Sequence, residues 1–207
     1  MRVLYLHGFA SGVLSGKAQF FQSRFSEKGV ALEIPDLAAG DFENLTVSGQ
    51  LRVVEQLVGS DPVAIIGSSM GGYLAALYAS LHANAARLVL LAPAFGFPIR
   101  WLETLGPEKT ADWRNSGYMD VFHYGENRPA RLSWGLIEDA QRWPAEPSFT
   151  QPGLIFHGTR DDVVPFEYSE RFAAAHPNVR LRLLDSDHQL SDSVEIIWRE
   201  TRDFLLR

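Results

Sequence analysis

The sequence predicts a single α/β domain in which helices cover both faces of a mainly parallel β-sheet, as a three-layer α/β/α sandwich. Four of six short apolar runs are almost continuously apolar, as parallel strands are when both faces are buried. Segments with helical periodicity alternate with these runs, which is typical of this architecture. A chain of 207 residues also suits one domain. The six predicted strands, each followed by a turn signal, are 2–8, 31–37, 63–69, 86–94, 152–159 and 179–185.

The predicted helices follow from apolar residues spaced three or four positions apart. Val47, Leu51, Val54 and Val58 repeat in this way, and Gly59 follows them, where a helix commonly ends at a glycine. The same kind of periodicity predicts further helices near 18–25, 74–81, 172–175 and 194–204.

One long segment, 95–151, interrupts the alternation of strands and helices. It contains four of the five tryptophans, and its helical periodicity is poor except near 132–140. A structureless loop of this length is unusual in a compact domain. We therefore expect a small helical insert over one end of the sheet. We favour a lid that lines a binding site, and the alternative is an excursion with a small core of its own.

Composition argues against several classes of function. The net charge of −6 leaves no basic stripe that could neutralise phosphates, so we expect neither nucleic acid nor an anionic membrane as a partner. The absence of cysteine removes thiol nucleophiles, thiolate metal sites and disulfides. No apolar stretch approaches the length of a membrane span, and the N-terminal apolar run is shorter than that of a secretory signal. We therefore expect a cytoplasmic protein without membrane insertion.

The segment from Gly67 to Gly71 reads GSSMG and fits the G-x-S-x-G pattern of a nucleophile elbow. It lies between a predicted buried strand and a predicted helix, which is the context that this turn requires. The central residue, Ser69, is then a candidate nucleophile, and the two glycines allow the strand and helix backbones to approach closely. The alternative is a glycine-rich turn that only packs closely or binds a phosphate. Neither G-K-[ST] nor G-x-G-x-x-G is present to support phosphate or dinucleotide binding.

A serine hydroxyl needs a general base, and the base needs an acid that orients it. His188 follows the last predicted strand, so it lies at the same edge of the sheet as Ser69 and is the favoured base among six histidines. Residues as close in sequence to His188 as Asp185 and Asp187 rarely point at its imidazole. The candidate acids are Asp161 and Asp162 after the fifth predicted strand, with Asp185 and Asp187 as rivals.

Four motifs, LHGFASG, GSSMGGYLA, HGTRDDVVP and SDHQL, occur in this order between residues 4 and 190. In these motifs the chain resembles the α/β-hydrolase superfamily and is most similar to small bacterial serine esterases and thioesterases. The resemblance implies six parallel strands in the spatial order 2-1-3-4-5-6, with the active site at the switch point between strands 1 and 3. It also places the 95–151 insert where the family has its lid.

The resemblance also assigns roles to individual residues. The family pattern H-G-x-x-D-x-x-V-P selects Asp161 rather than Asp162 as the acid. The oxyanion hole is expected to use the backbone N–H groups of Met70 and of Phe9, with Ala10 as the alternative to Phe9. In the same comparison, the two histidines that precede a glycine at a strand end are expected to be structural, namely His7 and His157.

The sequence thus predicts a serine hydrolase that cleaves small to medium, partly apolar esters or thioesters through an acyl-enzyme. We expect Phe95, Trp101 and Trp134 to line the substrate site, and we expect no metal or other cofactor. The alternatives are a non-catalytic binding module on the same scaffold, or a peptidase, C–C-bond hydrolase or acyltransferase with the same triad. A metalloenzyme that uses His7, His157 and Asp161 has no recognised ligand spacing. Oligomeric state and the physiological substrate do not follow from the sequence.

Overall fold

The computed structural model describes residues 2–206, and its centre is a six-stranded parallel sheet. The strands lie in the order β2-β1-β3-β4-β7-β8, and each neighbouring pair is parallel. This is the spatial order that the resemblance implies. The strand numbers differ from the expected ones because β5 and β6 belong to the insert. The six strands are β1 (Arg2–Leu6), β2 (Leu32–Glu33), β3 (Val63–Ser68), β4 (Ala85–Leu91), β7 (Gly153–Gly158) and β8 (Val179–Leu184).

The edge strand β2 is much shorter than the predicted strand 31–37. Only Leu32 and Glu33 pair with β1. Pro35 follows two positions later, and a proline has no N–H to donate to the next rung of a ladder.

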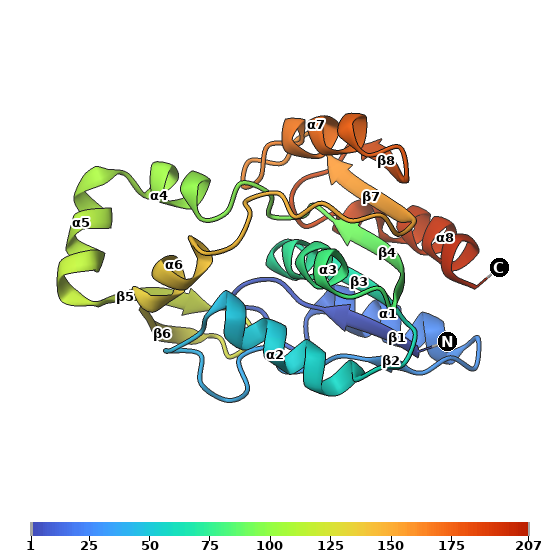
Figure 1. Cartoon of the computed structure of the whole chain (residues 1–207), viewed down its shortest axis with the longest axis horizontal. Helices are drawn as coiled ribbons and strands as arrows, with labels where there is room; N and C mark the ends of the chain where they lie inside the picture. The colour runs from blue at the N-terminus through green and yellow to red at the C-terminus, as the bar shows by residue number, and fades with distance from the viewer. Residues whose placement is uncertain (1, 207) are drawn as a thin grey trace.

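Helices cover both faces of the sheet, as the alternating pattern predicts. The helices α2 (Val47–Val58), α3 (Met70–Leu81) and α7 (Glu167–Ala175) share a core with Leu4 and Leu6 of β1. The helices α1 (Gly16–Ser26) and α8 (Val194–Leu205) share a second core with Val3 and Tyr5. Neighbouring strand residues point to opposite faces, so β1 contributes to both cores. Figure 1 shows α2 and α3 in front of the strands and α1 behind them. A single 3₁₀ turn, η1 (Ser191–Ser193), precedes α8.

The insert contains a β-hairpin that the sequence analysis did not predict. Its helices are α4 (Ile99–Leu105), α5 (Pro107–Ser116) and α6 (Gly135–Ala140), and between them β5 (Tyr118–His123) pairs antiparallel with β6 (Arg128–Ser133). The expectation of a small helical insert is therefore wrong for 118–133, which form this hairpin. Tyr118 and Phe122 are exposed on the hairpin, so apolar residues on its solvent side hide the alternation that marks a half-buried strand.

Figure 1 shows the insert as a lobe beyond the end of the sheet to which the strand arrows point. Its core is a row of tryptophans, in which Trp113 lies between Trp101 and Trp134 at ring-centroid distances of 5.3 and 5.2 Å. The insert therefore has a small core of its own, which is the feature that the alternative interpretation proposed. No helix within residues 2–206 is both long and apolar enough to cross a membrane.

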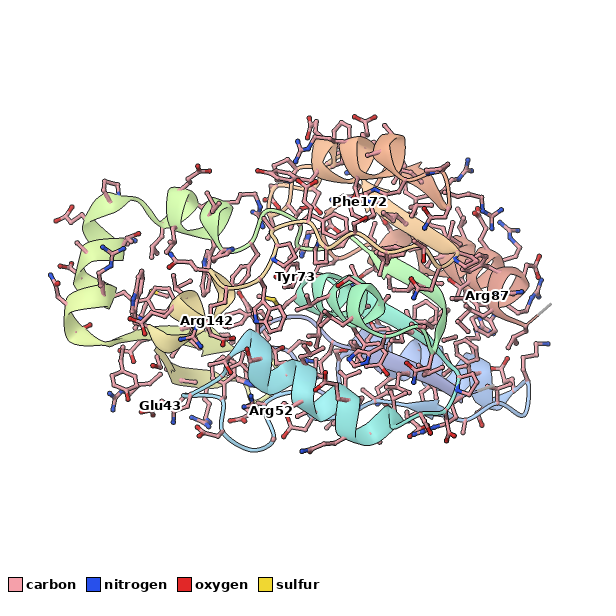
Figure 2. The ribbon with its side chains drawn as sticks, viewed as in Figure 1. Glu43, Arg52, Tyr73, Arg87, Arg142 and Phe172 are labelled. Carbon is pink, nitrogen blue, oxygen red and sulfur yellow. The ribbon has the colours of Figure 1, made fainter. Side chains whose placement is uncertain are left out.

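Polar contacts fasten the end of the insert to the body of the protein. The buried carboxylate of Asp139 in α6 accepts hydrogen bonds from the backbone N–H and the hydroxyl of Ser48, each 2.7 Å long. The Ser48 hydroxyl in turn accepts a hydrogen bond from Trp143 Nε1 at 3.1 Å. Tyr73 of α3, labelled in Figure 2, donates its hydroxyl proton to the carbonyl oxygen of Pro144 at 3.1 Å. These contacts join α6 and the following loop to α2 and α3.

Candidate active site

Ser69 occupies a sharp turn between β3 and α3, with φ 53° and ψ −115°. Non-glycine residues rarely adopt this conformation, and it is costly unless the surroundings enforce it. A Cβ atom on Gly67 would lie 2.2 Å from the carbonyl oxygen of Gly71, and one on Gly71 would lie 2.0 Å from the carbonyl oxygen of Leu6. No side chain fits at either position. This contact explains the glycines that the sequence places on both sides of Ser69.

The structure brings Ser69, His188 and Asp161 together from the loops that follow β3, β8 and β7. His188 Nε2 lies 3.1 Å from Ser69 Oγ, and His188 Nδ1 lies 2.7 Å from Asp161 Oδ2. The loop that carries His188 passes close over the end of β7, where a Cβ atom on Gly158 would lie 2.3 Å from the carbonyl oxygen of Ser186. A carboxylate only accepts hydrogen bonds, so Nδ1 carries the proton and Nε2 presents its lone pair to the serine hydroxyl.

Four donors hold the Asp161 carboxylate. The backbone N–H groups of Val163 and Val164 donate to Oδ1 at 2.9 and 2.8 Å. His188 Nδ1 and His157 Nε2 donate to Oδ2 at 2.7 and 3.0 Å. Although burial raises the pKa of the Asp161 carboxyl, the hydrogen bonds from His157 and His188 outweigh it and hold that pKa well below its usual range. Asp161 is therefore ionised at neutral pH.

The rival aspartates are engaged elsewhere. Asp162 is exposed. Asp185 pairs with Arg160 at 2.8 Å. Asp187 accepts hydrogen bonds from two backbone N–H groups of its own turn, at 2.9 and 3.1 Å. Asp161 is the aspartate that hydrogen-bonds the imidazole of His188.

His157 is more closely connected to the site than its expected structural role suggested. The side chain is fully buried. Its Nδ1 accepts a hydrogen bond from Ser169 Oγ at 2.7 Å, which leaves the proton on Nε2. That proton is shared between the Val164 carbonyl at 2.9 Å and Asp161 Oδ2 at 3.0 Å. His157 therefore positions the carboxylate. The four-residue spacing from Asp161, at the end of a predicted strand, was the available sequence signal.

Two backbone N–H groups beside Ser69 are free to bind an anion. Within residues 2–206, neither Met70 N–H nor Phe9 N–H donates to a protein acceptor. Met70 is the first residue of α3, where an N–H group has no partner inside the helix. The loop after β1 runs alongside the serine, since a Cβ atom on Gly8 would lie 3.5 Å from Ser69 Cβ. His7 braces this loop through a 3.0 Å hydrogen bond from Nδ1 to the carbonyl oxygen of Gly8.

A cavity of about 1030 Å³ opens beside Ser69 and His188. Phe9 forms part of its wall, together with Lys17 and Phe20 of α1 and with Tyr124 at the tip of the insert hairpin. The contribution of α1 to this wall could not be predicted from the sequence. The periodicity of a predicted helix does not indicate which end of that helix lines a cavity.

The prediction that Phe95 and Trp134 line the substrate site is corrected by their packing. Phe95 is fully buried and stacks on Phe172, which Figure 2 labels, with ring centroids 4.5 Å apart. Trp134 packs inside the insert. Neither residue lines the cavity beside Ser69 in the described part of the chain. Trp101, the third predicted lining residue, is not among the described residues that line that cavity either, but its ring packs against the wall residue Phe9 with ring centroids 5.2 Å apart.

The described residues also bear on a metal centre, including the set His7, His157 and Asp161. In the range 2–206, no group of three or more histidine, aspartate or glutamate side chains is arranged to hold a metal ion. His7, His157 and Asp161 do not form such a group.

A family model described as "Uncharacterised protein family (UPF0227)" matches residues 2–204. The chain belongs to this family. No curated protein sequence matches this UPF0227 chain. Among solved structures, it is similar to alpha/beta hydrolase domain-containing protein 10 from mouse, with 20% identity over 98% of this chain and 88% of that chain and a TM-score of 0.81.

Two further solved structures show the same fold. Est1E from Butyrivibrio proteoclasticus with ferulic acid bound is 23% identical over 99% of this chain and 87% of that chain, with a TM-score of 0.81. The monoacylglycerol lipase of Paleococcus ferrophilus is 16% identical over 98% and 93% of the two chains, with a TM-score of 0.77. The UPF0227 chain therefore has the α/β-hydrolase fold, as the sequence motifs implied.

Proposed function

We propose that this protein is a serine hydrolase that cleaves carboxylic esters or thioesters. The observation that carries the proposal is the position of the His188 imidazole. It hydrogen-bonds Ser69 Oγ at 3.1 Å on one side and Asp161 Oδ2 at 2.7 Å on the other. A serine, an imidazole and a carboxylate in this arrangement are the parts that acyl transfer to serine requires.

In the proposed reaction, Ser69 Oγ attacks the acyl carbon of the substrate while His188 Nε2 takes the hydroxyl proton. His188 then gives that proton to the departing alcohol or thiol as the tetrahedral intermediate collapses to an acyl-enzyme. Water attacks the acyl-enzyme with His188 as the base, and the carboxylic acid leaves as Ser69 recovers its proton. Asp161 stays ionised throughout, keeps the proton on Nδ1 and stabilises the imidazolium.

The N–H groups of Met70 and Phe9 are the proposed donors to the oxyanion of the tetrahedral intermediate. Both lack a protein acceptor in the described chain. Met70 adds the partial positive charge of the α3 N-terminus. Loss of one such donor costs about 3 kcal/mol of transition-state stabilisation.

The substrate is proposed to be small to medium in size and partly apolar. Phe9, Phe20 and Tyr124 give the cavity an aromatic wall. The insert contributes to this wall, since the tip of its hairpin contacts the loop after β1 through a 3.2 Å hydrogen bond from Gly125 N–H to the Ala10 carbonyl. We propose that the insert acts as a cover over the substrate site. Est1E with bound ferulic acid and the monoacylglycerol lipase, which share the fold, support ester chemistry.

A fluorophosphonate probe tests the proposal, because it modifies a serine only where a base has activated the hydroxyl. Mass spectrometry is expected to locate one adduct on Ser69 in the wild type. The neighbouring serine supplies a matched control: Ser68→Ala should still be labelled, whereas His188→Ala should not. A folded wild-type protein that forms no adduct would overturn the proposal. A panel of p-nitrophenyl esters and acyl-CoA thioesters then separates esterase from thioesterase activity.

A further inference from the structure

Among the described residues that line the cavity beside Ser69, Lys17 of α1 is the charged one. No aspartate, glutamate or arginine is among the described residues that line it. Lys17 is half-buried, and within residues 2–206 it forms neither an ion pair nor a hydrogen bond through its side chain. A lysine is seldom withdrawn from water without a partner, because the ammonium group then loses hydration that nothing replaces.

The carboxylates nearest to Lys17 leave its ammonium group available. Burial lowers the pKa of Lys17 to about 8, and Asp187 and Asp161 oppose this only by attraction from a distance. Both of these carboxylates already accept hydrogen bonds, Asp161 from four donors and Asp187 from two backbone N–H groups. His188 lines the same cavity. With a pKa of about 8, the ammonium group is mostly charged at neutral pH, and no described residue forms an ion pair with it.

A neighbouring cavity shows a different distribution of charge. It has a volume of about 460 Å³ and shares the loop after β1 with the Ser69 cavity. Charges of both signs line it, among them Asp36, Glu43, Arg128 and Arg131. The neighbouring cavity thus carries charges of both signs, whereas Lys17 gives the cavity at Ser69 a positive charge without a carboxylate among its described lining residues, in a protein whose net charge is −6.

We propose that the substrate carries an anionic group, a carboxylate or a phosphate, and that Lys17 binds this group while the scissile bond lies at Ser69. This inference rests on the proposed serine hydrolase activity. The Lys17 ammonium offers three donors, and a partly dry cavity strengthens their interaction with an anion. The aromatic wall accommodates the carbon chain that joins the anionic group to the ester. Lys17 thereby determines specificity and takes no part in bond cleavage.

Pairs of esters in which one member carries an anionic group and the other is neutral test the proposal. On the acyl side, p-nitrophenyl hydrogen glutarate is compared with p-nitrophenyl valerate. On the alcohol side, 4-(butyryloxy)benzoate and 4-(butyryloxy)phenyl phosphate are each compared with 4-(butyryloxy)benzamide, which separates carboxylate from phosphate. The ratio of kcat/KM for the anionic ester to that for the neutral ester is measured at pH 7. The variants are Lys17→Met, Lys17→Arg, which keeps the charge, and Lys28→Met, which removes an exposed lysine in the turn that follows α1.

For at least one pair, Lys17→Met is expected to lower this ratio about 10- to 100-fold. The ratio should stay near the wild-type value in Lys17→Arg and Lys28→Met. Raising the pH from 7 to 9 passes the pKa of about 8 and should lower the ratio in the wild type, but not in Lys17→Arg. A merely structural lysine would not produce this pH dependence. If Ser69 is still labelled but Lys17→Met leaves all of these ratios unchanged, this inference is overturned while the proposed function stands. A lack of labelling at Ser69 would overturn the proposed function and the inference with it.

Discussion

The substitution Asp161→Asn changes a hydrogen-bond role and leaves the shape of the side chain almost unaltered. The wild-type carboxylate accepts at both oxygens: Oδ1 from the backbone N–H groups of Val163 and Val164, and Oδ2 from two imidazoles. An asparagine side chain accepts only at its oxygen and donates only at its nitrogen. The two backbone N–H groups fix the amide oxygen at the Oδ1 position, so the amide nitrogen must face His157 and His188.

The size of the effect follows from the tautomer of His188. An amide N–H cannot accept the Nδ1 proton, so His188 moves that proton to Nε2 and presents a donor to Ser69 Oγ. The base is then lost while the geometry is kept. The expected fall in kcat is about 10⁴-fold, as for a wrong tautomer in other serine triads. This corresponds to about 5 kcal/mol of activation free energy. Asp161 does not line the described cavity, so KM should change little.

Steady-state hydrolysis of p-nitrophenyl butyrate measures both constants, and the rate of fluorophosphonate labelling reports on Ser69 directly. The neighbouring exposed carboxylate provides the control, since Asp162→Asn removes the same charge without touching His188. A folded Asp161→Asn variant whose kcat lies within tenfold of that of Asp162→Asn would refute the reasoning about the tautomer.

Three further predictions concern stability. Gly71→Ala places a Cβ atom 2.0 Å from a backbone carbonyl of β1 and should cost about 3 kcal/mol or more, whereas Gly16→Ala meets nothing within 4 Å and should be neutral in thermal unfolding. Lys17→Met should raise the free energy of unfolding at pH 7 by about 1–2 kcal/mol, because a folded-state pKa of about 8, below the unfolded value of about 10.4, penalises the charged form. That gain should shrink between pH 8 and 10 in urea unfolding, and a constant gain would contradict it. Asp139→Ala leaves the Ser48 donors unpaired, so it should cost about 2 kcal/mol and speed limited proteolysis of the insert, and equal cleavage rates would argue against this anchor.

The parts of the fold that the sequence predicted are those in which one local pattern has one physical solution. The pattern at the strand end is a buried strand followed by Gly67, a serine and Gly71. This pattern allows few arrangements other than a tight strand-to-helix turn. The insert hairpin had no such signal. Its exposed Tyr118 and Phe122 break the alternation of apolar and polar residues, and its pairing depends on contacts distant in sequence.

The same distinction applies to the candidate site. Ser69, Asp161 and His188 follow parallel strands, whose carboxyl ends share one edge of the sheet, so their proximity could be predicted. The residues of the cavity wall could not be predicted in this way. Phe95 is apolar and near the insert, but Phe172 of α7 covers its ring. Lys17 reaches the cavity because α1 crosses one face of the sheet, a tertiary relation that no sequence spacing expresses.

Several features that lower the stability of the fold lie at this edge of the sheet. Of the six non-glycine residues with positive φ in the range 2–206, three flank or form the candidate site: Ser69 itself, Ala10 beside Phe9, and Leu190 two positions after His188. The unpaired charge of Lys17 lies on the wall of the same cavity. Each of these features costs stability that a protein selected for folding alone would recover by substitution. Their concentration around one serine hydroxyl is the pattern expected when binding and chemistry constrain the sequence, and it favours a catalyst over an inert scaffold.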